Sequence, residues 1–126
     1  MLVDDNDMNL EIATDLLQRQ GGFAIDCATN GKEAVTRFTQ SEPGTYDAIL
    51  MDIRMPVMDG YAASRAIRAS DHSDARTVFI LAMTADAFEE DIRLAAEAGM
   101  DGHISKPIDF RRLMARLSEA FERPCP

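Results

Sequence analysis

The residues best suited to chemistry in this sequence are acids that follow short apolar runs. Met1–Val3 leads into Asp4 and Asp5, and Ala48–Met51 leads into Asp52. A carboxylate at the end of a buried strand needs a partner or a chemical role, because burying an unpaired charge is costly. Ile53 follows Asp52, so no helix cap or turn accounts for this aspartate. Asp52 is therefore a candidate nucleophile or metal ligand.

Two further apolar runs also end in polar residues. Val78–Met83 precedes Thr84, and a short segment around His103–Ser105 precedes Lys106. The carboxyl ends of parallel strands meet at one edge of a sheet, where ligands of such folds bind. Clustered carboxylates repel one another, and a divalent cation such as Mg²⁺ removes that repulsion. With a lysine and a threonine hydroxyl nearby, these parts describe a site for Mg²⁺ and a phosphoryl group.

The elements that position these residues alternate apolar runs with segments of helical period, five times along the chain. The expected strands are Met1–Val3, Phe23–Ala28, Ala48–Met51, Val78–Met83 and a short segment around His103–Ser105. Continuous apolar character in the third and fourth runs is typical of strands covered on both faces, as in a parallel sheet between helix layers. Five βα units predict an α/β domain with right-handed crossovers.

The segments between these strands carry apolar residues at helical spacing. They are Ile12, Ala13, Leu16 and Leu17, then Ala34, Val35 and Phe38, then Ala63, Ala66 and Ile67, then Phe88, Ile92 and Ala95, and finally Phe110, Leu113, Met114, Leu117 and Phe121. Glycine after a last turn commonly ends a helix, so Gly21, Gly44 and Gly99 predict three of the helix ends.

Length and charge narrow the classes of function. The 126 residues, 46% of them hydrophobic, predict one domain over 1–126 with an ordinary core. A net charge of −9 argues against direct nucleic-acid binding, which normally needs a basic surface. No apolar run approaches the roughly 18 residues of a membrane span, and the acidic start does not resemble a signal peptide. Cys27 and Cys125 lack metal-ligand or redox spacing, so we expect free thiols, with a disulfide as the weaker alternative.

Four motifs occur in a fixed order along nearly the whole chain: "VDDN" at 3–6, "LMDIRMPVMDG" at 50–60, "MTA" at 83–85 and "SKP" at 105–107. Each is weak alone, but the ordered set resembles the response-regulator receiver domains of two-component signalling. "VDDNDMN", "MDIRMPVMDG" and "GMDGHISKPI" are most similar to receivers of hybrid sensor histidine kinases. The resemblance implies a flavodoxin-like fold, a doubly wound five-stranded parallel sheet with strand order 2-1-3-4-5.

The resemblance also implies how the acids act. Asp52 is expected to accept a phosphoryl group from the phosphohistidine of a histidine kinase or a histidine phosphotransfer protein. Mg²⁺ is expected to be bound directly by Asp5, Asp52 and the backbone carbonyl of Arg54, and through water by Asp4.

The remaining site residues are assigned in the same way. Lys106 is expected to pair with a phosphate oxygen, Thr84 to hydrogen-bond the phosphoryl group as a switch, and Ala85 to leave room for it. His103 occupies a switch position where the family usually has Tyr or Phe. A histidine changes charge near neutrality, so a pH-sensitive switch stands beside the more common reading of a structural or exposed residue.

For the whole protein, the resemblance implies a signalling module and not an enzyme, apart from self-phosphorylation and autodephosphorylation. We expect it in the cytoplasm, or as the cytoplasmic part of a membrane-anchored sensor kinase, without direct contact to nucleic acid or insertion into the membrane. A phosphorylation-dependent dimer is a further expectation. The family usually has a longer first strand, which suggests a receiver excised from a longer protein whose parent would be a histidine kinase.

Simpler roles stay open for single residues. Asp4, Asp5 or Asn6 can cap the first helix, Asp86 with Glu89 has the spacing of a capping box, and Asp59-Gly60 suits a turn. A lone lysine at a strand end, such as Lys106, is usually solvated, and His72 is read as a loop residue.

Two other functions use similar parts. A Mg²⁺-dependent phosphatase of the haloacid-dehalogenase type needs a second acid two residues after its nucleophile, and Arg54 occupies that position. A phosphorylation-independent interaction module on the same fold would typically have lost a key acid or the lysine, and none is missing.

Overall fold

The five expected strands form one parallel sheet in the computed structural model, which describes residues 1–21, 25–55, 57–84, 89–105 and 110–121. The strands are β1 (Leu2–Val3), β2 (Cys27–Ala28), β3 (Ala48–Asp52), β4 (Phe79–Thr84) and β5 (Gly102–Ser105). The helices are α1 (Asp7–Gly21), α2 (Gly31–Thr39), α3 (Gly60–Ala69), α4 (Glu89–Glu97) and α5 (Phe110–Phe121). The strand order β2-β1-β3-β4-β5 confirms the predicted doubly wound fold.

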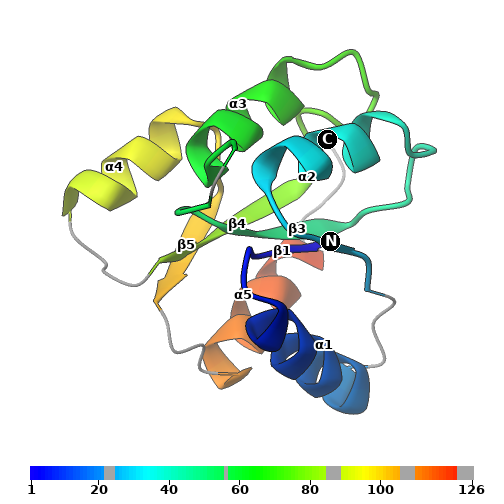
Figure 1. Cartoon of the computed structure of the whole chain (residues 1–126), viewed down its shortest axis with the longest axis vertical. Coiled ribbons are helices and arrows are strands. Elements are labelled where there is room, and N and C mark those ends of the chain that lie inside the picture. The colour runs from blue at the N-terminus through cyan, green and yellow to red at the C-terminus, as the bar shows by residue number, and fades with distance from the viewer. Residues whose placement is uncertain (22–24, 56, 85–88, 106–109, 122–126) are drawn as a thin grey trace.

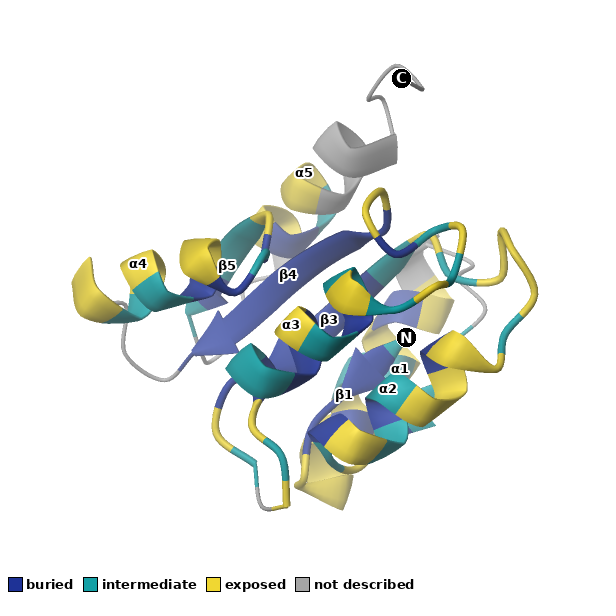
Figure 2. Cartoon of the chain, turned by 90° about the horizontal axis from the view of Figure 1, so that it is seen from above, coloured by how far each residue is buried: buried dark blue, intermediate teal, exposed yellow. Residues whose placement is uncertain are grey.

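Helices cover both faces of the sheet, with α2, α3 and α4 on one side and α1 and α5 on the other (Figure 1). Alternate side chains of β3 enter the two layers, so that Ile49 and Met51 pack toward α2 and α3 while Leu50 packs toward α1. Every residue of β4 is buried, as the continuous dark blue of that strand shows (Figure 2). The central strands therefore form a rigid base for whatever follows their carboxyl ends.

The first two strands, β1 and β2, are each two residues long. In the described residues, β1 pairs with β2 through Leu2 with Cys27 and Val3 with Ala28, and Ile25 and Asp26 are not in the strand. Phe23 and Ala24 of the expected strand lie outside the described residues. Because β2 lies at the edge of the sheet, its length is limited by the residues that β1 offers for pairing.

The buried face of α1 also differs from a simple reading of its apolar spacing. Leu10 and Leu17 are buried against the sheet, whereas Ile12 and Leu16 are 55% and 38% exposed. Met8, one turn before Ile12, is 68% exposed. Positions 8, 12 and 16 lie four residues apart and share one face of the helix, so α1 presents an apolar stripe to solvent. No helix in the described part of the chain is long and apolar enough to cross a membrane.

Polar side chains cap several of the helices. The Asn6 side chain accepts hydrogen bonds from the N–H groups of Met8 (3.0 Å) and Asn9 (3.3 Å) at the start of α1, which is the capping role expected of one residue in that group. Asp59, expected in a turn, caps α3 by accepting from the N–H of Ala62 at 2.8 Å. Gly99 follows α4 with a φ of +90°, as predicted for a helix end. Asp86 lies outside the described residues.

His72 does more than occupy a loop. Its Nδ1 accepts a hydrogen bond from the N–H of Asp74 at 3.0 Å, so its proton lies on Nε2, which donates to the Ser41 carbonyl at 2.8 Å. The ring also packs on Phe38 with 4.5 Å between ring centroids. His72 therefore joins the segment after α2 to the segment after α3, at the amino ends of the strands.

Candidate functional site

Parallel pairing brings three acids together at the carboxyl ends of β1 and β3. Val3 pairs with Met51, so Asp4 and Asp52 follow at adjacent positions of neighbouring strands. One carboxylate oxygen from each of Asp4, Asp5 and Asp52 lies within 4.8 Å of the others. Asp4 and Asp52 are only 4% and 5% exposed, whereas Asp5 faces solvent. Three carboxylates grouped at this edge favour the binding of a cation there.

The donor set fits Mg²⁺. All three groups offer carboxylate oxygens, the ligands that hard divalent cations prefer. Oxygens on opposite sides of an octahedral Mg²⁺ are about 4.2 Å apart, because each Mg–O bond is about 2.1 Å. The oxygens of this cluster lie within 4.8 Å of one another, so a single ion can contact more than one of them, and Asp5 leaves one side of the site accessible to an ion with its water. Asp5 and Asp52 would hold such an ion, with Asp4 near enough to contact it through water.

A cavity of about 220 Å³ surrounds the acids. It is lined by Asp4, Asp5, Asn6, Asn9, Asp52, Ile53, Arg54, Met83 and Thr84. Thr84 is the last residue of β4 and is buried, one position beyond Met83, which pairs with Asp52. The structure thus brings Thr84 and Arg54 to the same cavity as the acids.

Of the three other predicted site residues, the structure describes only one. Lys106 and Ala85 fall outside the described residues. His103 in β5 pairs with Ala82, two residues before Thr84, and is partly exposed. His103 is not among the described residues that line the cavity, and its role as a switch stays a prediction.

Asn9 is a member of the site that sequence reasoning missed. Its side-chain amide donates to Asp4 Oδ2 at 3.5 Å, and the N–H of Asn6 donates to Asp4 Oδ1 at 3.0 Å. These bonds orient the buried Asp4 carboxylate from the first turn of α1. The sequence signal for Asn9 was its position three residues after the N-cap Asn6, because such a residue lies on the same side of the first turn as the cap.

The segment from β3 to α3 folds tightly beneath Asp52. The Gly60 N–H donates to the Ile53 carbonyl at 2.8 Å, and a Cβ at Gly60 would overlap the Asp52 carbonyl oxygen. Between these points Val57 has a φ of 71°, which is unusual for a β-branched residue, and is 78% exposed. The backbone that follows the candidate acceptor is therefore held close to it.

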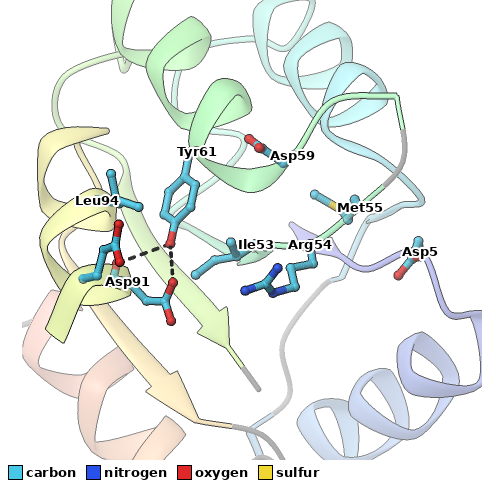
Figure 3. Close-up of a pocket in the computed structure, with 9 residues that line it drawn as sticks. Asp5, Ile53, Arg54, Met55, Asp59, Tyr61, Asp91 and Leu94 are labelled. Atoms are coloured by element: carbon cyan, nitrogen blue, oxygen red, sulfur yellow. Dashed lines mark hydrogen bonds between the residues drawn. The ribbon is translucent and has the colours of Figure 1, made fainter. Parts of the chain in front are cut away.

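A second, larger groove of about 640 Å³ adjoins the acids on the side of α4 (Figure 3). Tyr61 from the first turn of α3 donates its hydroxyl to the backbone carbonyl (3.3 Å) and carboxylate (3.4 Å) of Asp91 in α4. Arg54 lines both this groove and the cavity, and its side chain extends toward Tyr61 (Figure 3). Burial, then the charge of Asp91, raises the pKa of Tyr61, and Arg54 opposes that shift.

Comparison with known proteins identifies relatives over nearly the whole chain. The family model described as the response regulator receiver domain matches residues 1–118. The hybrid signal transduction histidine kinase L of Dictyostelium discoideum is 42% identical over 109 residues, which are 86% of this chain and 6% of that protein. Probable histidine kinase 6 of Oryza sativa subsp. japonica is 36% identical over an alignment of 134 positions, gaps included, which covers 94% of this chain and 14% of that protein. The chain therefore spans a small fraction of either relative.

Solved structures give the same picture. The receiver domain of a Pseudomonas aeruginosa sensor histidine kinase, solved with a magnesium ion coordinated in its active-site cleft, is 36% identical with a TM-score of 0.85, covering 97% of this chain and 95% of that one. A chain from the Saccharomyces cerevisiae complex of a histidine phosphotransfer signalling protein with the receiver domain of its downstream response regulator is 28% identical. Its TM-score is 0.79, covering 94% of this chain and 84% of that one.

Proposed function

The chain belongs to the response regulator receiver family, and on that premise we propose that Asp52 accepts a phosphoryl group from a partner's phosphohistidine, with Mg²⁺ as cofactor. The observation that carries the proposal is the convergence of Asp4, Asp5 and Asp52 within 4.8 Å at the edge of the sheet. A single buried aspartate has many explanations, but three acids from two adjacent strand ends form a site for a cation and an anionic phosphoryl group.

In the transfer step, an oxygen of the Asp52 carboxylate forms a bond to phosphorus as the phosphorus–nitrogen bond of the donor breaks. The electron pair of that bond returns to the imidazole nitrogen of the partner. Asp5, Asp52 and the Arg54 carbonyl would hold Mg²⁺ directly, and Asp4, oriented by Asn6 and Asn9, would contact it through water. When bound, the ion offsets the repulsion between the carboxylates and the phosphoryl oxygens.

Two residues then stabilise the product. Thr84 is at the end of β4 in the same cavity, from where its hydroxyl can donate to a phosphoryl oxygen. We assign Lys106 the pairing with another phosphoryl oxygen, as the family resemblance implies. Autophosphorylation and autodephosphorylation would then be the only reactions of this signalling module. If this receiver is part of a longer protein, that protein would be a hybrid histidine kinase, like the relatives of similar sequence.

The test is incubation with Mg²⁺ and acetyl phosphate, followed by intact mass and electrophoresis on a phosphate-binding gel. We expect one base-labile phosphoryl group on the natural chain and none on Asp52→Asn. Asp15→Asn is the matched control, because it removes an exposed carboxylate that, among the described residues, pairs with Arg19 on the same helix. If the natural chain gains no phosphoryl group, or Asp52→Asn gains one as readily, the proposal is wrong and a phosphorylation-independent module becomes the better reading.

The phosphoryl donor must also dock, and the exposed stripe of α1 lies where it would do so. Met8, Ile12 and Leu16 lie on the helix that begins three residues after Asp4. A protein that brings a phosphohistidine to Asp52 covers the rim formed by Asp4 and Asp5, and with it the start of α1. We therefore propose that this apolar stripe contacts a histidine phosphotransfer protein.

Replacing the central residue of the stripe tests this docking surface. With the phosphorylated Saccharomyces cerevisiae phosphotransfer protein as probe, Ile12→Ser should slow transfer by about 10-fold, the effect of losing a well-packed interface residue. Its labelling by acetyl phosphate, which needs no docking, should not change. Ile92→Ser, which truncates a 37% exposed side chain on α4, is the control. Equal transfer rates for the two variants would contradict the assignment.

A further inference from the structure

The first residue of α2 packs directly against the segment that joins β3 to α3. The Gly31 N–H donates to the Met58 carbonyl at 3.1 Å. A Cβ at Gly31 would lie 2.5 Å from that same carbonyl oxygen, 3.0 Å from the Asp59 carbonyl oxygen and 3.0 Å from the Ala63 Cβ. Two of these three neighbours are backbone atoms, so they cannot rotate away. Gly31 is thus required by close approach of two backbones.

The helix that carries Gly31 has little freedom to yield. The Asn30 side chain caps it by accepting from the Glu33 N–H at 2.8 Å. Ala34 and Phe38 are completely buried against the sheet, and α2 lies beside α3 (Figure 2). A side chain at position 31 would therefore displace the β3–α3 segment before it displaced α2.

That segment also carries part of the site. Its two ends are tied together where the Gly60 N–H donates to the Ile53 carbonyl, and Met58, two residues before Gly60, is held by the Gly31 N–H. Arg54 directly follows Ile53, the residue bonded to Gly60, and lines the cavity around the acids. A shift of the segment at Met58 would change the place of the Arg54 backbone relative to Asp52.

We propose that Gly31 is a positioning residue for the metal: its N–H and its lack of a side chain set the β3–α3 segment so that the Arg54 carbonyl meets an ion held by Asp5 and Asp52. The inference rests on the proposed function, because it assumes that Mg²⁺ binds at these acids. It extends the site to a helix that contributes no side chain to the cavity among the described residues.

Thermodynamic reciprocity gives a test that needs no mutation. If the Gly31–Met58 hydrogen bond favours Mg²⁺ binding, then Mg²⁺ must favour the hydrogen bond by the same factor. Hydrogen exchange of the Gly31 amide, followed by NMR, should therefore slow by at least about 5-fold when Mg²⁺ is added, the lower end of typical coupling. The Ser70 amide, which donates to Ile67 at the end of α3, is the internal control. Equal changes at Gly31 and Ser70 would overturn the proposal.

A variant provides the second arm. Gly31→Ala should weaken Mg²⁺ binding, measured by calorimetry, by at least about 5-fold. Gly99→Ala is the control, because it also crowds a neighbour, the Arg68 side chain at 2.8 Å, and is strained at a φ of +90°. It should lose stability yet bind Mg²⁺ like the natural chain. A folded Gly31→Ala with unchanged affinity would overturn the proposal.

The outcomes separate the inference from the function beneath it. If the natural chain binds no Mg²⁺, the proposed function fails. If the natural chain binds Mg²⁺ but either Gly31 measurement is negative, only the inference fails. If Gly31→Ala does not fold, hydrogen exchange in the natural chain decides alone.

Discussion

The three acids of the site differ in how they are held. Asp4 is buried and receives hydrogen bonds from Asn6 and Asn9, and Asp52 is buried at the end of β3. Asp5 alone is exposed, so it is the acid that an arriving ion with its water can reach first. Because strand ends fix the other two acids, the contribution of metal binding to stability is easiest to isolate at Asp5.

Removing the Asp5 charge should remove the stabilisation that Mg²⁺ provides. A ligand that binds only the folded state at 100 times its Kd raises the free energy of unfolding by about 2.7 kcal/mol. Urea denaturation with and without Mg²⁺ should show such an increase for the natural chain and most of it lost in Asp5→Asn. Asp15→Asn, which changes an exposed acid on α1, should keep the full increase. An undiminished effect in Asp5→Asn would place the ion elsewhere.

Some of these residues could be predicted from the sequence and others could not. Asp4, Asp52 and Thr84 end apolar runs, and parallel pairing alone brings such ends to one edge. The contact of Asn9 with Asp4 and the contact of Tyr61 with Asp91 depend instead on side-chain rotamers and on how helices sit over the sheet. Apolar periodicity does not determine either.

At the scale of elements, the Tyr61 side chain connects α3 to α4. Tyr61 reaches from the first turn of α3 to both the backbone and the carboxylate of Asp91 in α4, beside Arg54 (Figure 3). The tie joins the helix that follows the β3–α3 segment to the helix that follows Thr84. A displacement of the β3–α3 segment would therefore reach α4 through the contact between Tyr61 and Asp91.

The protonation of that tyrosine should affect stability at high pH. Burial and Asp91 raise the pKa of Tyr61, and burial and the hydrogen bond to Asp26 raise the pKa of Tyr46. A raised pKa means that the folded state holds the proton more tightly than the unfolded chain does. The stabilisation is therefore complete below the ordinary pKa of about 10 and is lost as pH rises through the folded-state pKa.

Absorbance titration can separate the two phenols, since the chain has only 2 tyrosines. Tyr61→Phe leaves Tyr46 as the one phenol, and Tyr46→Phe leaves Tyr61. We expect each remaining tyrosine to ionise above pH 10 in the folded protein. Urea denaturation of the natural chain should show falling stability over the same range. Ionisation of Tyr61 at or below pH 10 in folded Tyr46→Phe would contradict the tie to Asp91.

Elements themselves were predictable to different degrees. The runs that became β3 and β4 are long and wholly apolar, so their strands match the sequence pattern closely. In the described part of its run, β2 covers only Cys27 and Ala28, the two residues that pair with β1. For α1, helical spacing identified the helix but not which apolar residues face the sheet, since Ile12 and Leu16 form part of a second apolar face.

At the scale of the whole molecule, the carboxyl and amino edges of the sheet differ in the side chains that they gather. The carboxyl edge gathers like charges around a cavity, whereas the amino edge is held by a dense set of hydrogen bonds centred on Arg68. Its guanidinium donates to the carbonyls of Gly99 (2.9 Å), Ala75 (3.1 Å) and Val78 (2.7 Å) and to the Asp101 carboxylate (2.9 Å). A site of clustered charge tolerates strain because the opposite edge supplies stability.

Breaking the Arg68 network should therefore lower stability without altering the site. The Arg68 and Asp101 side chains are only 17% and 22% exposed. Arg68→Met removes the donor to three carbonyls and to the Asp101 carboxylate, which also accepts from the Ile80 N–H. We therefore expect the free energy of unfolding to fall by about 2–3 kcal/mol. Arg65→Met, which removes an exposed arginine from the same helix, should change stability by less than about 0.5 kcal/mol.

Urea denaturation of both variants, with and without Mg²⁺, distinguishes the two edges. The stabilisation by Mg²⁺ should be the same in Arg68→Met as in the natural chain, because Arg68 contacts the start of β4 and the acids lie at its other end, six residues along. Reduced stabilisation by Mg²⁺ in Arg68→Met would show that the amino edge also sets the geometry of the acids. An Arg68→Met variant as stable as Arg65→Met would show instead that the carbonyls find water as a substitute donor.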